Sequence, residues 1–172
     1  MANPTDNIYS LDGCNLENIE DLKIAVINTE WNPGIISMLT ESCKTTLLSL
    51  GITEDHIETV TVPGSFELPL GAKYIIGSAN RPDAVICLGC VIQGETKHDD
   101  YINSSISKSI SQLSLMSSTP VIFGVLTTNN EKQAIARADG NKGDKGKESA
   151  YAALKMISLK QKCQNSKSKI SF

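Results

Sequence analysis

The chain has 172 residues, of which 40% are hydrophobic and 20% charged, and a formal net charge of −3. This length predicts one domain with a substantial core, and the slightly acidic charge without a basic stripe argues against nucleic acid as a partner. No apolar run approaches the length of a membrane span, and the first residues lack the basic and apolar regions of a signal peptide. We therefore expect a cytoplasmic protein with no membrane partner.

Short apolar segments rich in Val and Ile alternate with segments of helical periodicity. The strand candidates lack a clean polar/apolar alternation, which is typical of strands buried on both faces, and they cover residues 23–28, 57–62, 84–92 and 121–126. The helix candidates have apolar residues on one face and cover residues 36–50, 68–79, 102–113, 131–138 and 150–157. This alternation predicts an α/β fold with a four-stranded parallel sheet, right-handed crossovers and helices on both faces.

A single α/β domain is predicted over residues 21–160. Residues 1–20 are weakly patterned, and residues 161–172 are polar and Lys/Ser-rich without a period, which predicts a disordered tail. The serine-rich side of the helix over residues 102–113 fits a contact with another subunit or a solvated face equally well.

The five cysteines include a C-x-x-C pair, Cys87 and Cys90. Their odd number and the lack of an export signal argue against a disulfide framework. Residues three apart in a strand point to opposite faces, so the two thiols should diverge, and no further Cys/His pair completes a metal site. We therefore assign no metal ligand and expect no redox function.

Unusual side chains follow each predicted strand, and ligands of open parallel sheets bind beyond the carboxyl ends of the strands. Trp31, the only tryptophan, lies in a loop poorly placed for burial, which favours stacking on a heteroaromatic ring over a place in the core. Phe66 fits core packing and a pocket wall equally well. Glu67 has two interpretations. Its carboxylate interacts favourably with the dipole at a helix start, or it accepts hydrogen bonds from a polyol.

The segment over residues 88–98 carries the strongest functional signal. It passes from a buried strand through Gly94 to Thr96 and His98 at a predicted helix start, where unpaired backbone N–H groups and the helix dipole favour an anion. Imidazole is the side chain best suited to transfer protons near neutral pH. Arg137 is either a solvated helix residue or a bidentate partner of a phosphate. A phosphate site beside a proton-transfer group predicts an enzyme that acts on a small phosphorylated molecule.

The chain closely resembles the lumazine synthase family in several ordered motifs, over roughly residues 24–156. The motifs cover residues 31–32, 62–69, 88–98, 120–128 and 137–138. The resemblance implies a flavodoxin-like three-layer sandwich and a transferase that needs no cofactor. Its two small-molecule substrates would be 5-amino-6-(D-ribitylamino)uracil and 3,4-dihydroxy-2-butanone 4-phosphate. They would condense to 6,7-dimethyl-8-ribityllumazine, phosphate and water, the penultimate step of riboflavin biosynthesis.

The resemblance also implies a role for each site residue. The residues that would contact the ribitylaminouracil are Trp31, Ser65, Phe66, Glu67, Cys90, Val91, Ile92 and Phe123. The residues that would bind the butanone phosphate are Glu95, Thr96 and Arg137. The catalytic residue would be His98, as a proton donor and acceptor. In the family, the counterparts of Phe123 and Arg137 come from a neighbouring subunit.

The family assembles as pentamers with active sites at subunit interfaces, which implies a homo-oligomer. The loop over residues 137–146 has the spacing of members that form a sixty-subunit icosahedral shell, and riboflavin synthase is a candidate partner. A strand from residues 1–20 could join the sheet of a neighbour. The chain departs from the common family pattern at Ala136 and Asn141.

Three other functions stay open from the sequence, and a fourth, a generic flavodoxin-like phosphate binder, is weaker still because it leaves the Trp31 and Phe66 segments unexplained. One is an archaeal-type riboflavin synthase, which would act on lumazine alone. The others are a non-catalytic flavin or lumazine carrier and a structural cage subunit. The presence of both His98 and Arg137 argues against a carrier, which needs neither a phosphate site nor a proton shuttle.

Overall fold

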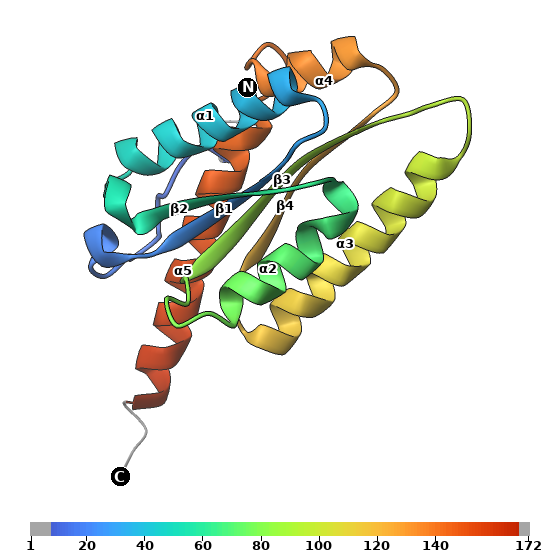
Figure 1. Ribbon diagram of the computed structural model, residues 1–172. Coiled ribbons are helices and arrows are strands. Elements are labelled where there is room, and N and C mark those ends of the chain that lie inside the picture. The colour runs from blue at the N-terminus through green and yellow to red at the C-terminus, as the bar shows by residue number, and fades with distance from the viewer. Residues whose placement is uncertain (1–7, 169–172) are drawn as a thin grey trace.

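The computed structural model describes residues 8–168, which form an α/β sandwich around one parallel sheet (Figure 1). The four strands lie in the order β2-β1-β3-β4. Their bounds are β1 (Ile24–Thr29), β2 (Ile57–Val62), β3 (Ala84–Ile92) and β4 (Val121–Thr128). β2 lies on one side of β1, and β3 and β4 lie on the other side. The direction in which strands are added therefore reverses between β1 and β3. The predicted fold class is confirmed.

Helices cover both faces of the sheet. The bounds on one face are α1 (Pro33–Ser49), α4 (Glu131–Ala138) and α5 (Lys145–Ser168), and on the other α2 (Leu68–Ile76) and α3 (His98–Ser117). Figure 1 shows α2 and α3 in front of the sheet and α5 behind it. Short 3-10 turns cover Ile19–Asp21, Glu54–His56 and Ser65–Glu67. Among the described residues, no helix is both long and apolar enough to cross a bilayer.

Strand β3 is central, and its side chains divide between two hydrophobic cores. Leu88 and Cys90 belong to the core under α1 and α5, whereas Cys87 and Val91 belong to the core under α2 and α3. The alternation of a strand therefore separates the two thiols of the C-x-x-C pair, as predicted. All five cysteines are unpaired.

The start of α5 packs directly on the backbone of α1. A methyl group on Gly146 would collide with the carbonyl oxygen of Leu39 and would lie 3.0 Å from the amide nitrogen of Cys43. Only glycine allows this close approach, which fixes the position of the first turn of α5. That turn carries several residues of the site described below.

The C-terminal end of the described chain differs from the sequence prediction. Residues 161–168, predicted as disordered, continue α5, because Gln161 and Asn165 hydrogen-bond to Glu17 and these eight residues include no Gly or Pro. Residues 169–172 lie outside the described residues. Residues 8–20 run along α5 of the same chain, for example from the amide of Asn15 to Ser158 Oγ at 3.0 Å, and residues 1–7 lie outside the described residues. A strand of this segment that joins a neighbour's sheet stays a prediction.

Candidate active site

A cavity of about 500 Å³ lies where β1, β2 and β3 end, beside the first turns of α3. It therefore occupies the place where a parallel sheet with this strand order binds ligands. Its lining residues are Trp31, Asn32, Gly64, Ser65, Phe66, Glu67, Cys90, Val91, Ile92, Gly94, Thr96, His98, Asp99 and Ile102. We call it the ring cavity. It brings together nine of the sequence-predicted site residues from three separate segments of the chain.

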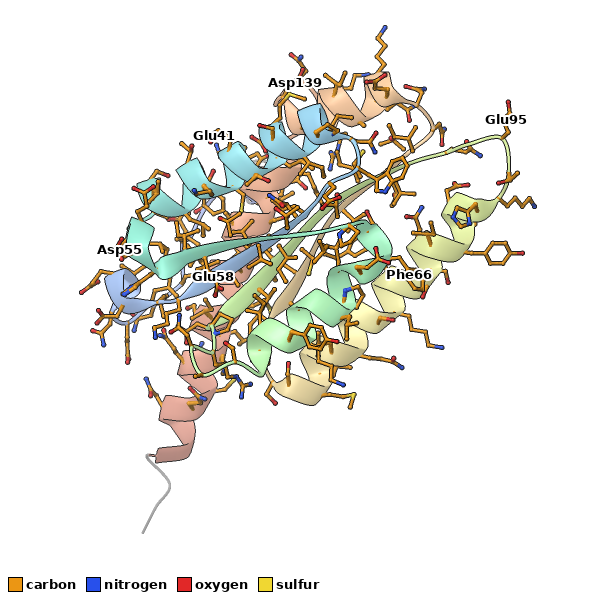
Figure 2. The ribbon with its side chains drawn as sticks, viewed as in Figure 1. Glu41, Asp55, Glu58, Phe66, Glu95 and Asp139 are labelled. Carbon is orange, nitrogen blue, oxygen red and sulfur yellow. The ribbon has the colours of Figure 1, made fainter. Side chains whose placement is uncertain are left out.

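Two aromatic rings in the ring cavity are available to a ligand. The side chain of Trp31 is 73% exposed and that of Phe66 is 59% exposed, so neither ring belongs to the core. Figure 2 shows Phe66 beside α3. Asn32 orients the Trp31 loop, because it adopts a left-handed conformation (φ 58°) before the first residue of α1 and donates from Nδ2 to the carbonyl oxygen of Cys90 at 3.1 Å. The rings offer flat apolar surfaces suited to a heteroaromatic ligand.

Two glycines let the walls of the ring cavity approach each other. A methyl group on Gly89 would lie only 2.7 Å from Ser65 Oγ, so β3 can pack against the 3-10 turn after β2 only because it has no side chain there. A methyl group on Gly64 would lie 3.1 Å from Glu67 Oε2 and 3.5 Å from Trp31 Cδ1. The carboxylate and the indole edge therefore flank the same stretch of backbone, which places a hydrogen-bond acceptor beside a stacking surface.

Cys90 contributes its backbone to the ring cavity. Its side chain belongs to the core on the opposite face of the sheet, while its carbonyl oxygen accepts the bond from Asn32. Burial, together with the nearby Glu131 carboxylate, raises the pKa of the Cys90 thiol to about 11. The thiol is therefore protonated at neutral pH and unsuited to nucleophilic attack.

The helix start predicted beside the anion site is present, since α3 begins at His98 and Thr96 lies just before it. Asp99 and Asp100 occupy the first turn, where carboxylates interact favourably with the helix dipole. Asp99 Oδ1 is buried without a hydrogen-bond partner among the described residues. The predicted phosphate ligand Glu95 is exposed at the outer end of the loop and points away from the ring cavity (Figure 2).

A second cavity, of about 680 Å³, lies along β4, α4 and the start of α5. Phe123 and Arg137 line this cavity, and neither lines the ring cavity. Three further cations, Lys132, Lys142 and Lys145, lie in the same wall. We call it the cationic cavity, because four basic side chains at one site strongly favour an anion in a protein whose net charge is negative.

The guanidinium of Arg137 is held in the wall of the cationic cavity by its own chain. Nη1 donates to the carbonyl oxygen of Lys142 at 3.1 Å, and Nη2 lies 3.4 Å from both carboxylate oxygens of Glu148. Glu148 also pairs with Lys145, at 3.5 Å between Oε2 and Nζ. Gly143 (φ 102°) leaves the space for this arrangement, because a methyl group there would lie 2.8 Å from Nη1. A guanidinium fixed in this way presents its other N–H groups for a phosphate.

Comparison with known proteins gives the family. The model of the 6,7-dimethyl-8-ribityllumazine synthase family matches residues 21–161. The chain belongs to the lumazine synthase family. It is 44% identical over 157 residues to the 6,7-dimethyl-8-ribityllumazine synthase of Cytophaga hutchinsonii, covering 91% of this chain and 98% of the relative. It is 40% identical over 164 residues to the enzyme of the same name from Phocaeicola vulgatus, covering 95% and 97%.

Membership of the lumazine synthase family decides among the functions that the sequence left open. The activity is that of a lumazine synthase in riboflavin biosynthesis, not that of a riboflavin synthase, a carrier or a passive cage subunit. The predicted enzyme is confirmed at that level.

Sequence reasoning assigned no role to several residues of this lumazine synthase site. Glu148 is the most important of them, since it joins Arg137 to Lys145. The only local signal for it is the three-residue spacing from Lys145 in the first turn of a helix, which is common for surface ion pairs. Among residues 8–168, no group of three or more His, Cys, Asp or Glu side chains is arranged to hold a metal ion.

Proposed function

We propose that each active site of this lumazine synthase is built from two neighbouring subunits, the ring cavity of one and the cationic cavity of the next. The observation that carries the proposal is that Phe123 and Arg137 line one cavity of the chain, whereas nine of the other predicted site residues line a different one. Phe123 and Arg137 would then complete the ring cavity of a neighbour. A homo-oligomer is required for activity in this arrangement, and isologous or cyclic contacts are the usual way to repeat such an interface.

The ring cavity would bind 5-amino-6-(D-ribitylamino)uracil. The pyrimidine ring would stack on Trp31 and contact Phe66, and the Glu67 carboxylate would accept hydrogen bonds from ribityl hydroxyls. Backbone groups over residues 90–92 would line the ring edge, as the buried side chain of Cys90 supports. Ser65, held against β3, would complete this side of the ligand.

The cationic cavity would bind the phosphate of 3,4-dihydroxy-2-butanone 4-phosphate. Arg137 offers a fixed guanidinium and Lys145 a second charge, while Glu95 and Thr96 lie on the loop before α3 that would face this group across the interface. The condensation needs an amine to attack a ketone, water and phosphate to leave, and a ring to close. His98 would give and take the protons, a contribution of about 10²- to 10⁴-fold, and the cations would stabilise the departing phosphate.

Exposed apolar side chains support a homo-oligomer, which we propose to be a pentamer. Large apolar side chains are exposed on α2 and α3, namely Leu70, Tyr74, Tyr101, Leu115 and Met116. Exposed apolar surface of this kind marks a contact with another protein. We further propose a cytoplasmic enzyme without a metal or organic cofactor. A sixty-subunit shell and a contact with riboflavin synthase are further proposals, which the same exposed surfaces would serve.

Co-expression of two impaired variants, assayed at substrate concentrations where each alone has little activity, tests the shared site. Trp31→Ala damages the ring cavity and Arg137→Ala the cationic cavity, so in mixed oligomers some interfaces combine two intact halves. Random assembly from equal amounts should restore about a quarter of the wild-type sites. The matched control is Trp31→Ala with Phe66→Ala, which both damage the ring cavity and should restore nothing. Activity is followed as fluorescent lumazine formed above the uncatalysed background, and an equal result for both pairs would refute a site shared between subunits.

A further inference from the structure

The N-terminal segment contacts the helix that carries part of the cationic cavity. Tyr9 packs edge-to-face on Tyr151, with ring centroids 6.0 Å apart and planes at 65°. The ammonium of Lys147 lies 4.6 Å from the centre of the Tyr9 ring, within the range of a cation–π contact. The Tyr9 hydroxyl accepts a hydrogen bond from the backbone amide of Asp144 at 3.2 Å. This bond joins residues 135 positions apart in the chain.

Asp144 is held from several directions at the point where α5 begins. Its Oδ1 accepts from the amide of Lys147 at 2.9 Å, which caps the helix, and its Oδ2 accepts from Ser42 Oγ of α1 at 2.5 Å. Its carbonyl oxygen accepts from the amide of Glu148 at 2.8 Å. The bond to Tyr9 satisfies its own amide, which a helix start otherwise leaves without an intrahelical partner.

The first turn of α5 connects Asp144 to the guanidinium of Arg137. Lys145 directly follows Asp144, and Glu148 lies one turn further along. Glu148 in turn pairs with Arg137 and with Lys145. A shift of the start of α5 therefore moves both the second cation and the carboxylate that orients the guanidinium.

The N-terminal segment is itself anchored on the other end of the same helix. The Asn15 amide donates to Ser158 Oγ at 3.0 Å, and Gln161 exchanges hydrogen bonds with the backbone of Glu17. Ile8 accepts from Lys155 Nζ at 3.3 Å. Because these bonds hold the segment along α5, the Tyr9 ring lies in a defined position next to Asp144.

We propose that Tyr9 is a positioning residue for the phosphate substrate. Its hydroxyl fixes the start of α5, and through Glu148 it fixes the guanidinium of Arg137. The inference rests on the proposed function of the cationic cavity. It gives the N-terminal segment a part in substrate binding without any contact between Tyr9 and the substrate.

Tyr9→Phe tests this role, because it removes the hydroxyl and keeps the ring contacts. The KM for butanone phosphate should rise about threefold, within the two- to tenfold range set by one neutral hydrogen bond. The KM for ribitylaminouracil and kcat should stay unchanged. Tyr151→Phe is the matched control, since it removes a hydroxyl from the same cluster and leaves the bond to Asp144. Ser42→Ala, which removes another bond to Asp144, should act in the same direction as Tyr9→Phe.

A cycle with Arg137→Ala separates the inference from the function on which it rests. If Tyr9 acts through Arg137, then Tyr9→Phe should add no further increase in that KM when Arg137 is already Ala. If Tyr9→Phe lowers the melting temperature but leaves both KM values unchanged, Tyr9 has only a structural role. That result would overturn this inference and leave the proposed function intact. An unchanged KM for butanone phosphate in Arg137→Ala itself would instead refute the proposed function of the cationic cavity.

Discussion

Replacement of Arg137 with Ala should weaken the binding of butanone phosphate selectively. The guanidinium is oriented by Lys142 and Glu148 before any ligand arrives, so its contact with a phosphate needs little reorganisation. A hydrogen bond to a charged group contributes about 1.5–3 kcal/mol, which corresponds to a rise of about 10- to 150-fold in the KM for this substrate. The KM for ribitylaminouracil should change little, since Arg137 lines the other cavity.

The stability of the protein should hardly change in the same variant. The Arg137 side chain is 39% exposed and lies 3.4 Å from Glu148, and such partly exposed ion pairs contribute about 0–1 kcal/mol. Lys145 still neutralises Glu148 at 3.5 Å after the replacement. The expected loss in melting temperature is therefore at most about 4 °C for a chain of this length.

Initial rates of lumazine formation, corrected for the uncatalysed reaction, measure both KM values when each substrate is varied in turn. Arg137→Lys is the matched control, because it keeps the charge but loses the planar, bidentate donor. We expect its KM for butanone phosphate to lie between those of the wild type and Arg137→Ala. A KM for butanone phosphate that does not change, or that rises only as much as the KM for ribitylaminouracil, would refute the assignment.

Three further changes have defined outcomes. His98→Ala should lower kcat by about a hundredfold, the low end of the range for proton transfer, and leave both KM values nearly unchanged, since holding the substrates together supplies much of the rate; complete loss of activity with intact binding would contradict this. Gly89→Ala should destabilise the protein by about 1–3 kcal/mol and raise the KM for ribitylaminouracil, because its methyl group displaces Ser65; wild-type melting and kinetics would show that the contact is not tight. Burial raises the pKa of Cys87 from 9.0 to about 12, so the free energy of unfolding should fall as the pH rises above about 9, and urea titrations should show a smaller fall in Cys87→Ala.

The fold was largely predictable from the sequence because its strands are short runs of Val and Ile that have no helical period. The errors lie at the ends of elements, where polar residues carry no periodic signal. Strand β4 continues to Thr128, beyond the predicted end at residue 126. The end of α5 was missed for a different reason, because contacts with Glu17, far away in the chain, stabilise its polar last turns.

The site was predictable where its residues follow one another along the chain. Trp31, the segment over residues 65–67 and the segment over residues 90–98 all follow strands of one sheet, so the rule for parallel sheets brings them together. Their division from Phe123 and Arg137 was implied only by the resemblance to the family, since no local pattern tells which cavity a residue lines. Glu148 and Tyr9 act through contacts made in three dimensions, and nothing in their sequence surroundings distinguishes them from other surface residues.

The strand order itself explains why the predicted site residues line two separate cavities of the chain. In the order β2-β1-β3-β4, the loops after β1, β2 and β3 meet at the ring cavity, whereas β4 lies at an edge of the sheet and its following helix turns to the other face. The cations after β4 therefore line an edge that a second subunit can approach, and the exposed rings of Trp31 and Phe66 form a cavity that lacks a cation clamp of its own. Each half alone offers either a stacking surface or a phosphate site. Condensation needs both at once, so under the proposed shared site the assembly of subunits would be part of the catalytic mechanism.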